Sequence, residues 1–320
     1  MRKFSIHFFI FCSPLFIGFL FLDGYISTIL KQSNSFAVKE YPTWNSIYSG
    51  KIDSDVLIYG NSRAWQHISP KILGNKISLK FYNLGIDGSN FGLQLLRHNE
   101  LLKYNKKPKV IIQTIDVFTF EKHTNLYNSD QFLPYMLWNT GLEKKILDYK
   151  GFHFLDFKIP MLRFYGNTSA INTVYDLFDG KEENPIQRIR GYQGLTYPTN
   201  IDLKQLEKIR YSVNLDTSLV ELFNQFLKKC KNDTINVILV YTPEFIEGQK
   251  CIQNRGEIIN LYSKICKKHN IPFYDYSNDS ISHNPKLFYN SMHLNKKGAE
   301  IFSNKLAIKI KNDLIVNEIE

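Results

Sequence analysis

The sequence predicts an α/β protein whose parallel sheet is covered by helices on both faces. Short apolar runs rich in Val, Ile, Phe and Tyr recur along the chain, at residues 56–59, 81–84, 110–115, 237–241 and 271–274. Segments with helical periodicity separate them, and strands that alternate with helices favour right-handed crossovers and a parallel sheet. With 320 residues, 43% of them hydrophobic, the chain can bury a full core as one enlarged domain or two smaller ones.

The expected helices follow these strands in order. Ser69-Pro70 is typical of an N-cap and a first helical residue, and Gly74 is expected to end that short helix. Ser89 or Asn90 is expected to cap the next helix. Apolar stripes at helical spacing lead to the fourth and fifth strands, and we interpret them as core: Leu219, Leu222, Phe223 and Phe226, then Ile258, Ile259, Tyr262 and Ile265.

The connection between the third and fourth strands is far longer than the dozen or so residues that a crossover needs. We therefore expect an insertion at about residues 118–202, inside an α/β domain that spans residues 31–320. The insertion is rich in aromatic residues, and long insertions beside an active face commonly act as lids or substrate walls. Aromatic rings suit sugar rings as well as packing, which makes Tyr192 and Arg190 substrate-contact candidates by location.

The N-terminus, residues 1–30, is predicted to be a membrane anchor. Residues 4–22 contain no Asp, Glu, Lys or Arg, and at about 1.5 Å per residue they just span a bilayer core. Arg2 and Lys3 before this run predict a cytoplasmic N-terminus and an extracytoplasmic domain at the cell membrane. A cleavable signal peptide is the alternative, but the small residues Ser35 and Ala37 lie too far beyond the run for a typical cleavage site.

Charge and cysteine content limit which ligands and partners the protein is expected to have. The net charge of +10 is scattered, so it indicates a solvated surface or attraction to anionic envelope polymers and lipid headgroups. No basic stripe alternates with aromatic residues, which argues against nucleic acid. Cys230, Cys251 and Cys266 lack the spacing of a zinc site, so no metal or cofactor is predicted. One disulfide among them is possible if the domain is exported.

A serine and a histidine at opposite ends of the chain are the candidate catalytic residues. Gly60-Asn61-Ser62-Arg63 directly follows the first strand, where a glycine permits a tight turn that exposes the serine. Asn290-Ser291-Met292-His293 precedes the last helical pattern. A hydroxyl nucleophile needs an adjacent base, and imidazole suits that role near neutral pH. We therefore expect the two loops to converge, with Ser62 as nucleophile and His293 as base.

These motifs resemble those of the SGNH/GDSL hydrolase superfamily, in particular its membrane-anchored branch that includes the D-alanine transfer protein and the alginate O-acetylation proteins. Gly60-Asn61-Ser62 is similar to the first block of that family, Gly85 or Gly88 to the glycine of its second block, and His293 to the histidine of its last block. The resemblance covers residues 53–117 and 235–312. It implies a three-layer, flavodoxin-like sheet and chemistry on ester-linked acyl groups.

Two positions depart from the family pattern. Asn290 stands where the family has the triad aspartate, and in a serine protease that exchange costs about 10⁴ in kcat. A backbone carbonyl could orient the histidine instead, or Asp275 or Asp279 could move into the role. Asp116 stands where the family has an asparagine that binds the oxyanion.

Neighbouring polar residues are candidates for supporting roles. Asn61 and Asn83 are candidate oxyanion donors in place of the missing asparagine, or residues of ordinary turns. Arg63 is expected to pair with Asp87 or Asp116 and so to support the turn.

The sequence thus favours an esterase or O-acyltransferase that acts on an acylated glycan or cell-envelope polymer. Ser62 would attack the ester carbonyl, and water or a sugar hydroxyl would accept the acyl group. The alternative is a catalytically reduced accessory protein that binds a glycan or a membrane-bound O-acyltransferase. A peripheral scaffold with a purely structural Gly-Asn-Ser turn is the third hypothesis.

Overall fold

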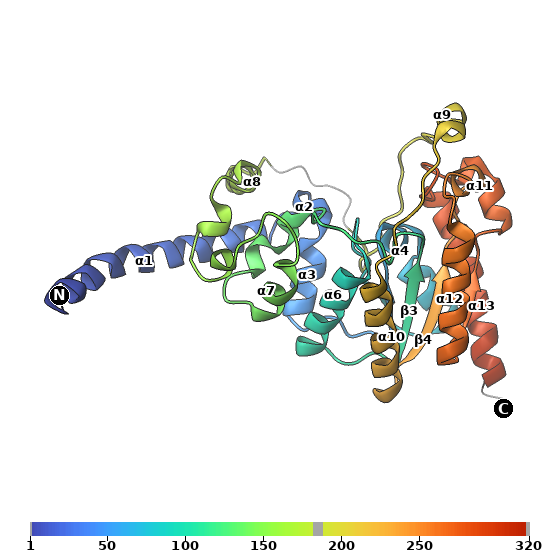
Figure 1. Ribbon diagram of the computed structural model, residues 1–320, viewed down its shortest axis with the longest axis horizontal. Coiled ribbons are helices and arrows are strands. Elements are labelled where there is room, and N and C mark those ends of the chain that lie inside the picture. Colours follow the sequence, from blue (N-terminus) through green and yellow to red (C-terminus); the bar gives the residue numbers. More distant parts are fainter. Residues whose placement is uncertain (1, 182–187, 318–320) are drawn as a thin grey trace. The chain divides into compact units, whose positions relative to one another are not determined.

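The computed structural model describes residues 2–181 and 188–317 (Figure 1). The chain forms two compact units. The first contains the described residues up to Asn45 together with those from Thr124 onward as far as residue 181. The second contains residues 46–123 and 188–317. The site described below lies wholly within the second unit.

The second unit contains one five-stranded parallel sheet in the order β2-β1-β3-β4-β5. Its strands are β1 (Val56–Tyr59), β2 (Phe81–Asn83), β3 (Val110–Ile115), β4 (Asn236–Tyr241) and β5 (Phe273–Asp275). This is the flavodoxin-like order, so the predicted fold class is confirmed. In such sheets the strand order reverses next to β1, and ligands bind at the carboxyl ends of the strands beside that point.

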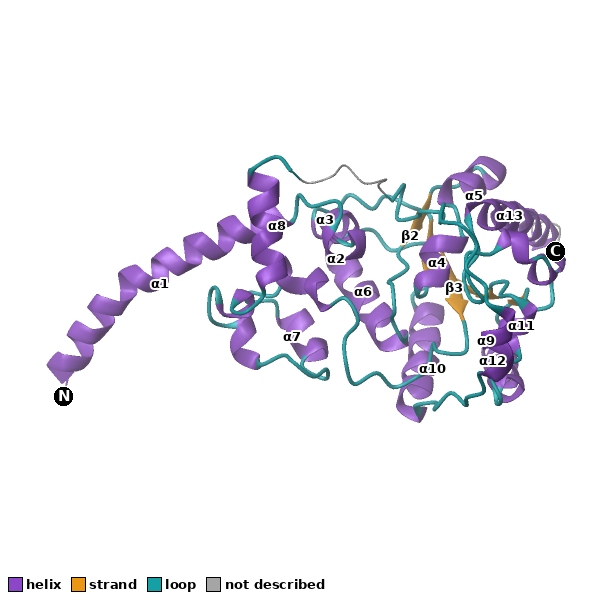
Figure 2. Ribbon diagram, turned by 90° about the horizontal axis from the view of Figure 1, so that it is seen from above, coloured by secondary structure: helices purple, strands orange, loops and turns teal. Residues whose placement is uncertain are grey.

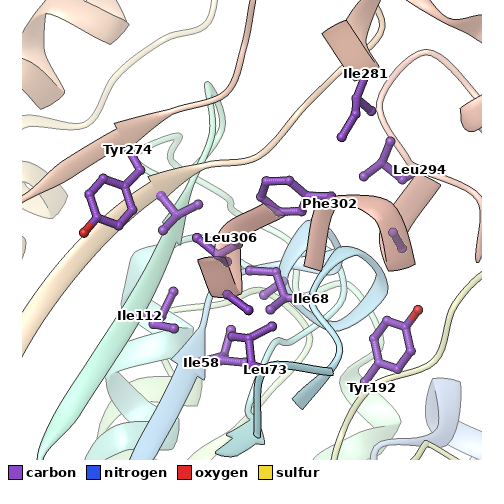
Figure 3. Close-up of a cluster of buried hydrophobic side chains, with 14 of the residues drawn as sticks. Ile58, Ile68, Leu73, Ile112, Tyr192, Tyr274, Ile281, Leu294, Phe302 and Leu306 are labelled. Atoms are coloured by element: carbon purple, nitrogen blue, oxygen red, sulfur yellow. The ribbon is translucent and has the colours of Figure 1, made fainter. Parts of the chain in front are cut away.

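Helices cover both faces of this sheet, which explains why its strands read as continuous apolar runs. All four residues of β1 are buried. Ile58, together with Ile112 of β3, packs with residues of α4, α5 and α13 (Figure 3). On the other side of the sheet, Phe91 of α6 stacks edge-on against Phe223 of α10 with ring centroids 4.7 Å apart.

The helices of the second unit are α4 (Ser62–His67), α5 (Pro70–Ile77), α6 (Phe91–Tyr104), α9 (Leu203–Lys208), α10 (Thr217–Asn232), α11 (Ile246–Gln249), α12 (Arg255–His269) and α13 (Lys296–Asn317). The boundary between the two units falls within α3 (Tyr41–Tyr48). Two short 3₁₀ helices, η4 (Ser280–His283) and η5 (Pro285–Leu287), precede α13.

The predicted helix ends are partly correct. Ser69 caps α5 and Pro70 is its first residue, as the sequence predicts. The prediction that Gly74 ends this helix is wrong, because α5 continues to Ile77 and stops where Ser78 adopts a left-handed conformation with φ 60°. A glycine inside a short helix costs only about 1 kcal/mol, which the packing of the buried Leu73 offsets.

The first unit is helical. It contains α1 (Arg2–Leu30), α2 (Phe36–Lys39), η1 (Ser129–Tyr135), α7 (Thr140–Ile146), η2 (Phe154–Phe157), η3 (Leu162–Phe164) and α8 (Thr168–Phe178). Among the described residues, one helix segment, Ile10–Leu30 of α1, is long and apolar enough to cross a membrane. That finding is compatible with a single-pass anchor and with a signal sequence.

The predicted insertion divides between the units. The described residues from Thr124 onward as far as residue 181 belong to the first unit, whereas the chain from Arg188 onward returns to the second. There the backbone N–H of Asn83 donates to Arg190 O at 2.9 Å, and the N–H of Lys296 donates to Leu195 O at 2.7 Å. Residues 31–45, which the sequence places in the α/β domain, belong to the first unit.

The two substrate-contact candidates of this segment differ in placement. Tyr192 is buried in the hydrophobic cluster of Figure 3, so its expected role as a substrate contact is wrong and it is a core residue. Arg190 is exposed and its contact with substrate stays a prediction. Cys12, Cys230, Cys251 and Cys266 are all free thiols in this structure.

Candidate active site

Ser62 is held at the carboxyl end of β1 by a turn that only glycine permits. Gly60 has φ 145°, and a Cβ atom there would lie 1.7 Å from Thr114 Oγ1. The next residue, Asn61, caps α4 by accepting the backbone N–H of Arg63 at 3.0 Å. Ser62 is therefore the first residue of α4, where its backbone N–H points out of the helix end.

The structure brings Ser62 and His293 together. Ser62 Oγ lies 2.8 Å from His293 Nε2, although the two residues are 231 positions apart in the chain. Both side chains are half-buried. A serine hydroxyl within hydrogen-bond reach of an imidazole nitrogen is the geometry that a general base needs to activate a nucleophile.

The tautomer of His293 follows from its other ring nitrogen. His293 Nδ1 lies 3.1 Å from Asn290 Oδ1. The same oxygen accepts the backbone N–H groups of Met292 and His293, at 2.9 and 2.8 Å, which fixes which end of the amide faces the ring. Nδ1 must then carry the proton, and Nε2 is left with a lone pair that accepts the Ser62 hydroxyl.

The environment of His293 opposes its protonation. Burial, and secondly the positive charge of Arg63, lower the pKa of His293 to about 4. The side chain that orients the ring, Asn290, carries no negative charge to counter these effects. His293 is consequently neutral at pH 7, which a general base requires, but its low pKa makes it a weak base.

His67 positions the loop that carries His293. Its Nε2 accepts the backbone N–H of Leu294 at 3.0 Å, so the proton lies on Nδ1, which donates to Thr242 Oγ1 at 3.1 Å. Burial and then the charge of Arg63 lower the pKa of His67 well below its usual value. His67 therefore remains neutral and keeps both hydrogen bonds at ordinary pH.

Arg63 fastens the nucleophile turn to the loop after β4. Its guanidinium donates to Glu244 Oε2 at 2.8 Å, to Thr242 Oγ1 at 3.1 Å and to Thr242 O at 2.5 Å. The expected partner, Asp87 or Asp116, is wrong, because the ion pair is formed with Glu244. Arg255 and Tyr241 donate to the other oxygen of that carboxylate, so both oxygens of Glu244 and all three guanidinium nitrogens of Arg63 take part in hydrogen bonds.

Asn61 and Asp116 form a hydrogen-bonded pair at the point where the strand order reverses. Asn61 Nδ2 donates to Asp116 Oδ2. Asp116 Oδ1 accepts the backbone N–H of Phe118 at 2.9 Å and the hydroxyl of Thr119 at 3.2 Å. The carboxylate thus orders the loop after β3 and holds Asn61, instead of pairing with Arg63. One amide hydrogen of Asn61 remains a candidate oxyanion donor.

The loop after β2 lies against the nucleophile turn. The backbone N–H of Ile86 donates to Gly60 O at 3.0 Å, and a Cβ at Gly85 would lie 2.7 Å from Trp65 N. Asn83 Nδ2 donates to the carbonyls of Ala64 and Ile68, at 2.8 and 2.9 Å.

The oxyanion candidates of that loop differ in whether they keep a hydrogen-bond donor for substrate. The backbone N–H of Gly85 donates to Asn83 Oδ1, so Asn83 and Gly85 hold the turn and have no donor left for substrate. Gly88 is exposed, with φ 59°. Over residues 2–181 and 188–317, the backbone N–H groups of Ser62 and Gly88 form no hydrogen bond and are available as donors.

The carboxylates that were alternatives to Asn290 have other partners. Asp275 accepts the backbone N–H of Ser277 at 2.8 Å, and Asp279 accepts that of Ile281 at 3.0 Å and pairs with Lys305. The group that faces His293 Nδ1 is Asn290, so the expectation that Asp275 or Asp279 could replace it is wrong for this structure. In the described part of the chain, no group of three or more His, Cys, Asp or Glu side chains is placed to bind a metal ion.

Sequence reasoning missed the positioning role of His67. It placed Thr242-Pro243-Glu244, just past β4, on the same rim of the sheet as Ser62 and expected this segment to shape the pocket, but it assigned no partner to Thr242 or Glu244. The available signal was this position, since the residues after parallel strands gather at one edge. His67 has no comparable signal, because its contact with Leu294 exists only in the folded chain.

The fold and this site define a flavodoxin-like α/β protein with a Ser62, His293 and Asn290 constellation at the carboxyl edge of its sheet. No family model and no curated protein matches the chain.

Solved structures similar to the chain include the following three. A protein from Desulfitobacterium hafniense assigned as a lipolytic protein of the G-D-S-L family is 12% identical, with 79% of this chain and 97% of that one covered and a TM-score of 0.37. A protein from Bacteroides fragilis assigned as an acylhydrolase is 14% identical over 87% and 100%, with a TM-score of 0.35. A GDSL-like lipase from Bacteroides thetaiotaomicron is 14% identical over 85% and 97%, with a TM-score of 0.35. At these scores the function has to be argued from the site itself.

Proposed function

We propose that this chain is a membrane-anchored, extracytoplasmic serine esterase or O-acyltransferase of the SGNH/GDSL type, acting on ester-linked acyl groups of a cell-envelope or exported polysaccharide. The observation that carries the proposal is the 2.8 Å contact between Ser62 Oγ and the lone pair of His293 Nε2. A structural turn needs neither the contact nor this tautomer, whereas nucleophilic catalysis needs both.

The reaction would proceed in two acyl-transfer steps. Ser62 Oγ attacks the ester carbonyl while its proton passes to His293 Nε2, and the oxyanion accepts hydrogen bonds from the N–H groups of Ser62 and Gly88. The C–O bond then breaks, and His293 returns the proton to the leaving alcohol. Water or a sugar hydroxyl attacks the acyl-Ser62 ester with His293 again as base, which releases the product and regenerates the enzyme.

Three features support the location and the substrate class. An apolar helix long enough to cross a bilayer follows Arg2 and Lys3, as in a single-pass anchor with its domain outside the cytoplasm. The net charge of +10 favours an anionic polymer. Tyr197 is 61% exposed, and its ring lies 5.7 Å from that of Tyr289, whose backbone N–H donates to His293 O. This aromatic pair is suited to contact a sugar ring.

Labelling with a fluorophosphonate probe tests the nucleophile. The full chain in detergent should be labelled, and Ser62→Ala should abolish the label. Ser263→Ala is the matched control, since Ser263 lies on the exposed side of α12 and only donates to the carbonyl of Ile259 in its own helix. Absence of label in the folded wild type, or label that persists in Ser62→Ala, would refute the catalytic proposal.

A second candidate is a catalytically reduced protein that binds a glycan or a membrane-bound O-acyltransferase. The observation that favours it is the neutral amide of Asn290 where a carboxylate would stabilise the imidazolium. The two functions differ in acetate release from O-acetylated oligosaccharides. Release that depends on His293 supports the enzyme, whereas glycan binding with no release above that of His293→Ala supports the accessory protein.

A further inference from the structure

The outer side of α8 carries an apolar stripe that the protein does not cover. Ile171, Tyr175 and Phe178 are 41%, 63% and 77% exposed, and their spacing places them on one side of the helix. Towards the protein, α8 presents the buried Ala170 and the half-buried Leu177. The apolar arc of this helix is therefore wider than the surface on which it packs.

The side of α8 that faces neither the protein nor the apolar stripe is polar. Asn172, Asp176 and Asp179 are exposed and lie together on the remaining side of the helix or at its end. An apolar arc opposite a polar one, on a helix of 11 residues at the surface, is the pattern of a helix that lies in the plane of a membrane interface. Because α8 contains no Lys or Arg, its binding would depend on apolar contact and not on anionic lipid.

The chain immediately before α8 is hydrogen-bonded to α1 at Asp23. Arg163 donates to both carboxylate oxygens of Asp23, each at 2.7 Å, and both side chains are buried. The backbone N–H of Met161 donates to the same carboxylate at 2.7 Å. Such a buried, fully bonded pair is costly to separate. Asp23 is the first charged residue after the uncharged run 4–22. Within the apolar segment Ile10–Leu30, the part from Asp23 onward is partly covered by protein, because Asp23, Ile26, Ser27 and Leu30 are buried. The connection therefore marks the point where the uncharged, uncovered part of α1 ends.

The orientation of α8 relative to α1 fits this position. The two helices pack against each other, and Figure 2 shows α8 running across α1 near the C-terminal end of α1. If α1 crosses a bilayer, a helix that runs across it beside Asp23 lies along the membrane surface. Tyr165, two residues before the N-cap Asn167, is 90% exposed on the same connection.

We propose that α8 lies in the interface of a phospholipid bilayer beside the anchor, with Ile171, Tyr175 and Phe178 inserted among the lipids. The proposal rests on the membrane anchor of the proposed function but not on its chemistry. It assigns the first unit a second membrane contact, which would restrict how the chain tilts about α1. A tyrosine and a phenylalanine at the boundary are typical of membrane-interface belts.

Tryptophan fluorescence in full-length protein reconstituted into zwitterionic phosphatidylcholine nanodiscs tests this contact. Tryptophan is introduced singly by Phe178→Trp on the stripe, by Asn172→Trp on the polar side of α8 and by Leu15→Trp in α1. The emission of wild type, from Trp44, Trp65 and Trp138, is subtracted. With lipids brominated near the headgroup, emission from Phe178→Trp should fall at least twofold, and emission from Asn172→Trp should fall much less.

The Leu15→Trp variant separates this proposal from the anchor. Quenching of Leu15→Trp by lipids brominated deep in their acyl chains, without quenching of Phe178→Trp by lipids brominated near the headgroup, overturns the interfacial helix and leaves the anchor standing. Quenching of neither overturns both, whereas the labelling of Ser62 by a fluorophosphonate is a separate measurement. If Phe178→Trp is shielded from aqueous acrylamide but not quenched by brominated lipid, a protein partner or a second copy covers the stripe and the proposal is wrong.

Discussion

Asn290 Oδ1 faces His293 Nδ1 at 3.1 Å while it also accepts two backbone N–H groups. When asparagine replaces the aspartate of a serine protease triad, the histidine adopts the wrong tautomer. Here the backbone N–H groups of Met292 and His293 prevent the amide from presenting its own N–H to the ring. The site therefore keeps the orientation of a Ser-His-Asp triad and lacks only its negative charge.

Asn290→Asp should make the candidate enzyme faster. A carboxylate would accept the same hydrogen bonds, raise the pKa of His293 from about 4 and stabilise the imidazolium in the transition state. Because the tautomer is already correct, we expect part of the effect seen in proteases, on the order of 10- to 100-fold in kcat/KM. Hydrolysis of p-nitrophenyl acetate at pH 7 measures it.

Asn290→Ala is the matched control for that change. It removes the acceptor of Nδ1–H and leaves the backbone N–H groups of Met292 and His293 without their side-chain partner, so activity should fall. An Asn290→Asp variant no faster than wild type, with an unchanged circular dichroism spectrum, would show that the missing charge does not limit this site.

The pH dependence of ester hydrolysis should be shifted to low pH. A general base must be unprotonated, and the pKa of His293 is lowered to about 4, so kcat/KM should stay nearly constant from pH 8 down to about pH 5. Below pH 4 it should fall about tenfold per unit as Nε2 becomes protonated. A histidine with the ordinary pKa of about 6.5 would keep only about 3% of its activity at pH 5.

A rate profile for p-nitrophenyl acetate between pH 3.5 and 8, with circular dichroism at each pH to verify folding, provides the measurement. A midpoint between pH 6 and 7 in wild type would mean that burial and Arg63 do not depress the pKa of His293 as the structure indicates.

The architecture could be predicted from the sequence because its signals are local. Buried parallel strands are continuous apolar runs, and the Gly60 turn places Ser62 where an α/β sheet binds ligands. The partners of these residues were not predictable in the same way. Arg63 pairs with Glu244, which is 181 residues away and follows a strand not adjacent to β1. No periodicity encodes that contact, and the two nearer carboxylates misled the prediction.

The division into units was also beyond the reach of sequence patterns. The residues up to Asn45 group with the described part of the insertion from Thr124 onward, and the pair of Asp23 with Arg163 is one of the contacts that joins them. In the sequence, Asp23 follows the apolar run 4–22, and Arg163 stands between Leu162 and Phe164. From sequence alone, Asp23 reads only as the end of an apolar run.

Arg63 and Glu244 should be energetically coupled. Arg63→Met leaves the buried carboxylate of Glu244 with only Arg255 and Tyr241 as partners, and we expect a loss of about 3 kcal/mol in the free energy of unfolding. Glu244→Gln should also destabilise, because the Arg63 guanidinium is then buried without a counter-charge.

The double variant Arg63→Met/Glu244→Gln should lose at least about 1 kcal/mol less than the sum of the single losses, as neighbouring charged partners do. Urea unfolding followed by circular dichroism gives the three values. Additivity within about 0.5 kcal/mol would show that the pair contributes no coupling of its own.

Gly60→Ala should disrupt the site and destabilise the second unit. At φ 145° an L-residue is strained, and the new Cβ would lie 1.7 Å from Thr114 Oγ1 and 2.9 Å from Ala64 Cβ. We expect a loss of at least about 3 kcal/mol in the free energy of unfolding, measured with urea, together with loss of fluorophosphonate labelling at Ser62.

Gly256→Ala is the matched control, because Gly256 lies in α12 with open space around it. Alanine there should leave the free energy of unfolding unchanged or raise it by about 0.5 kcal/mol. Equal stability of the Gly60→Ala and Gly256→Ala variants would mean that the turn before Ser62 does not have the constrained conformation described here.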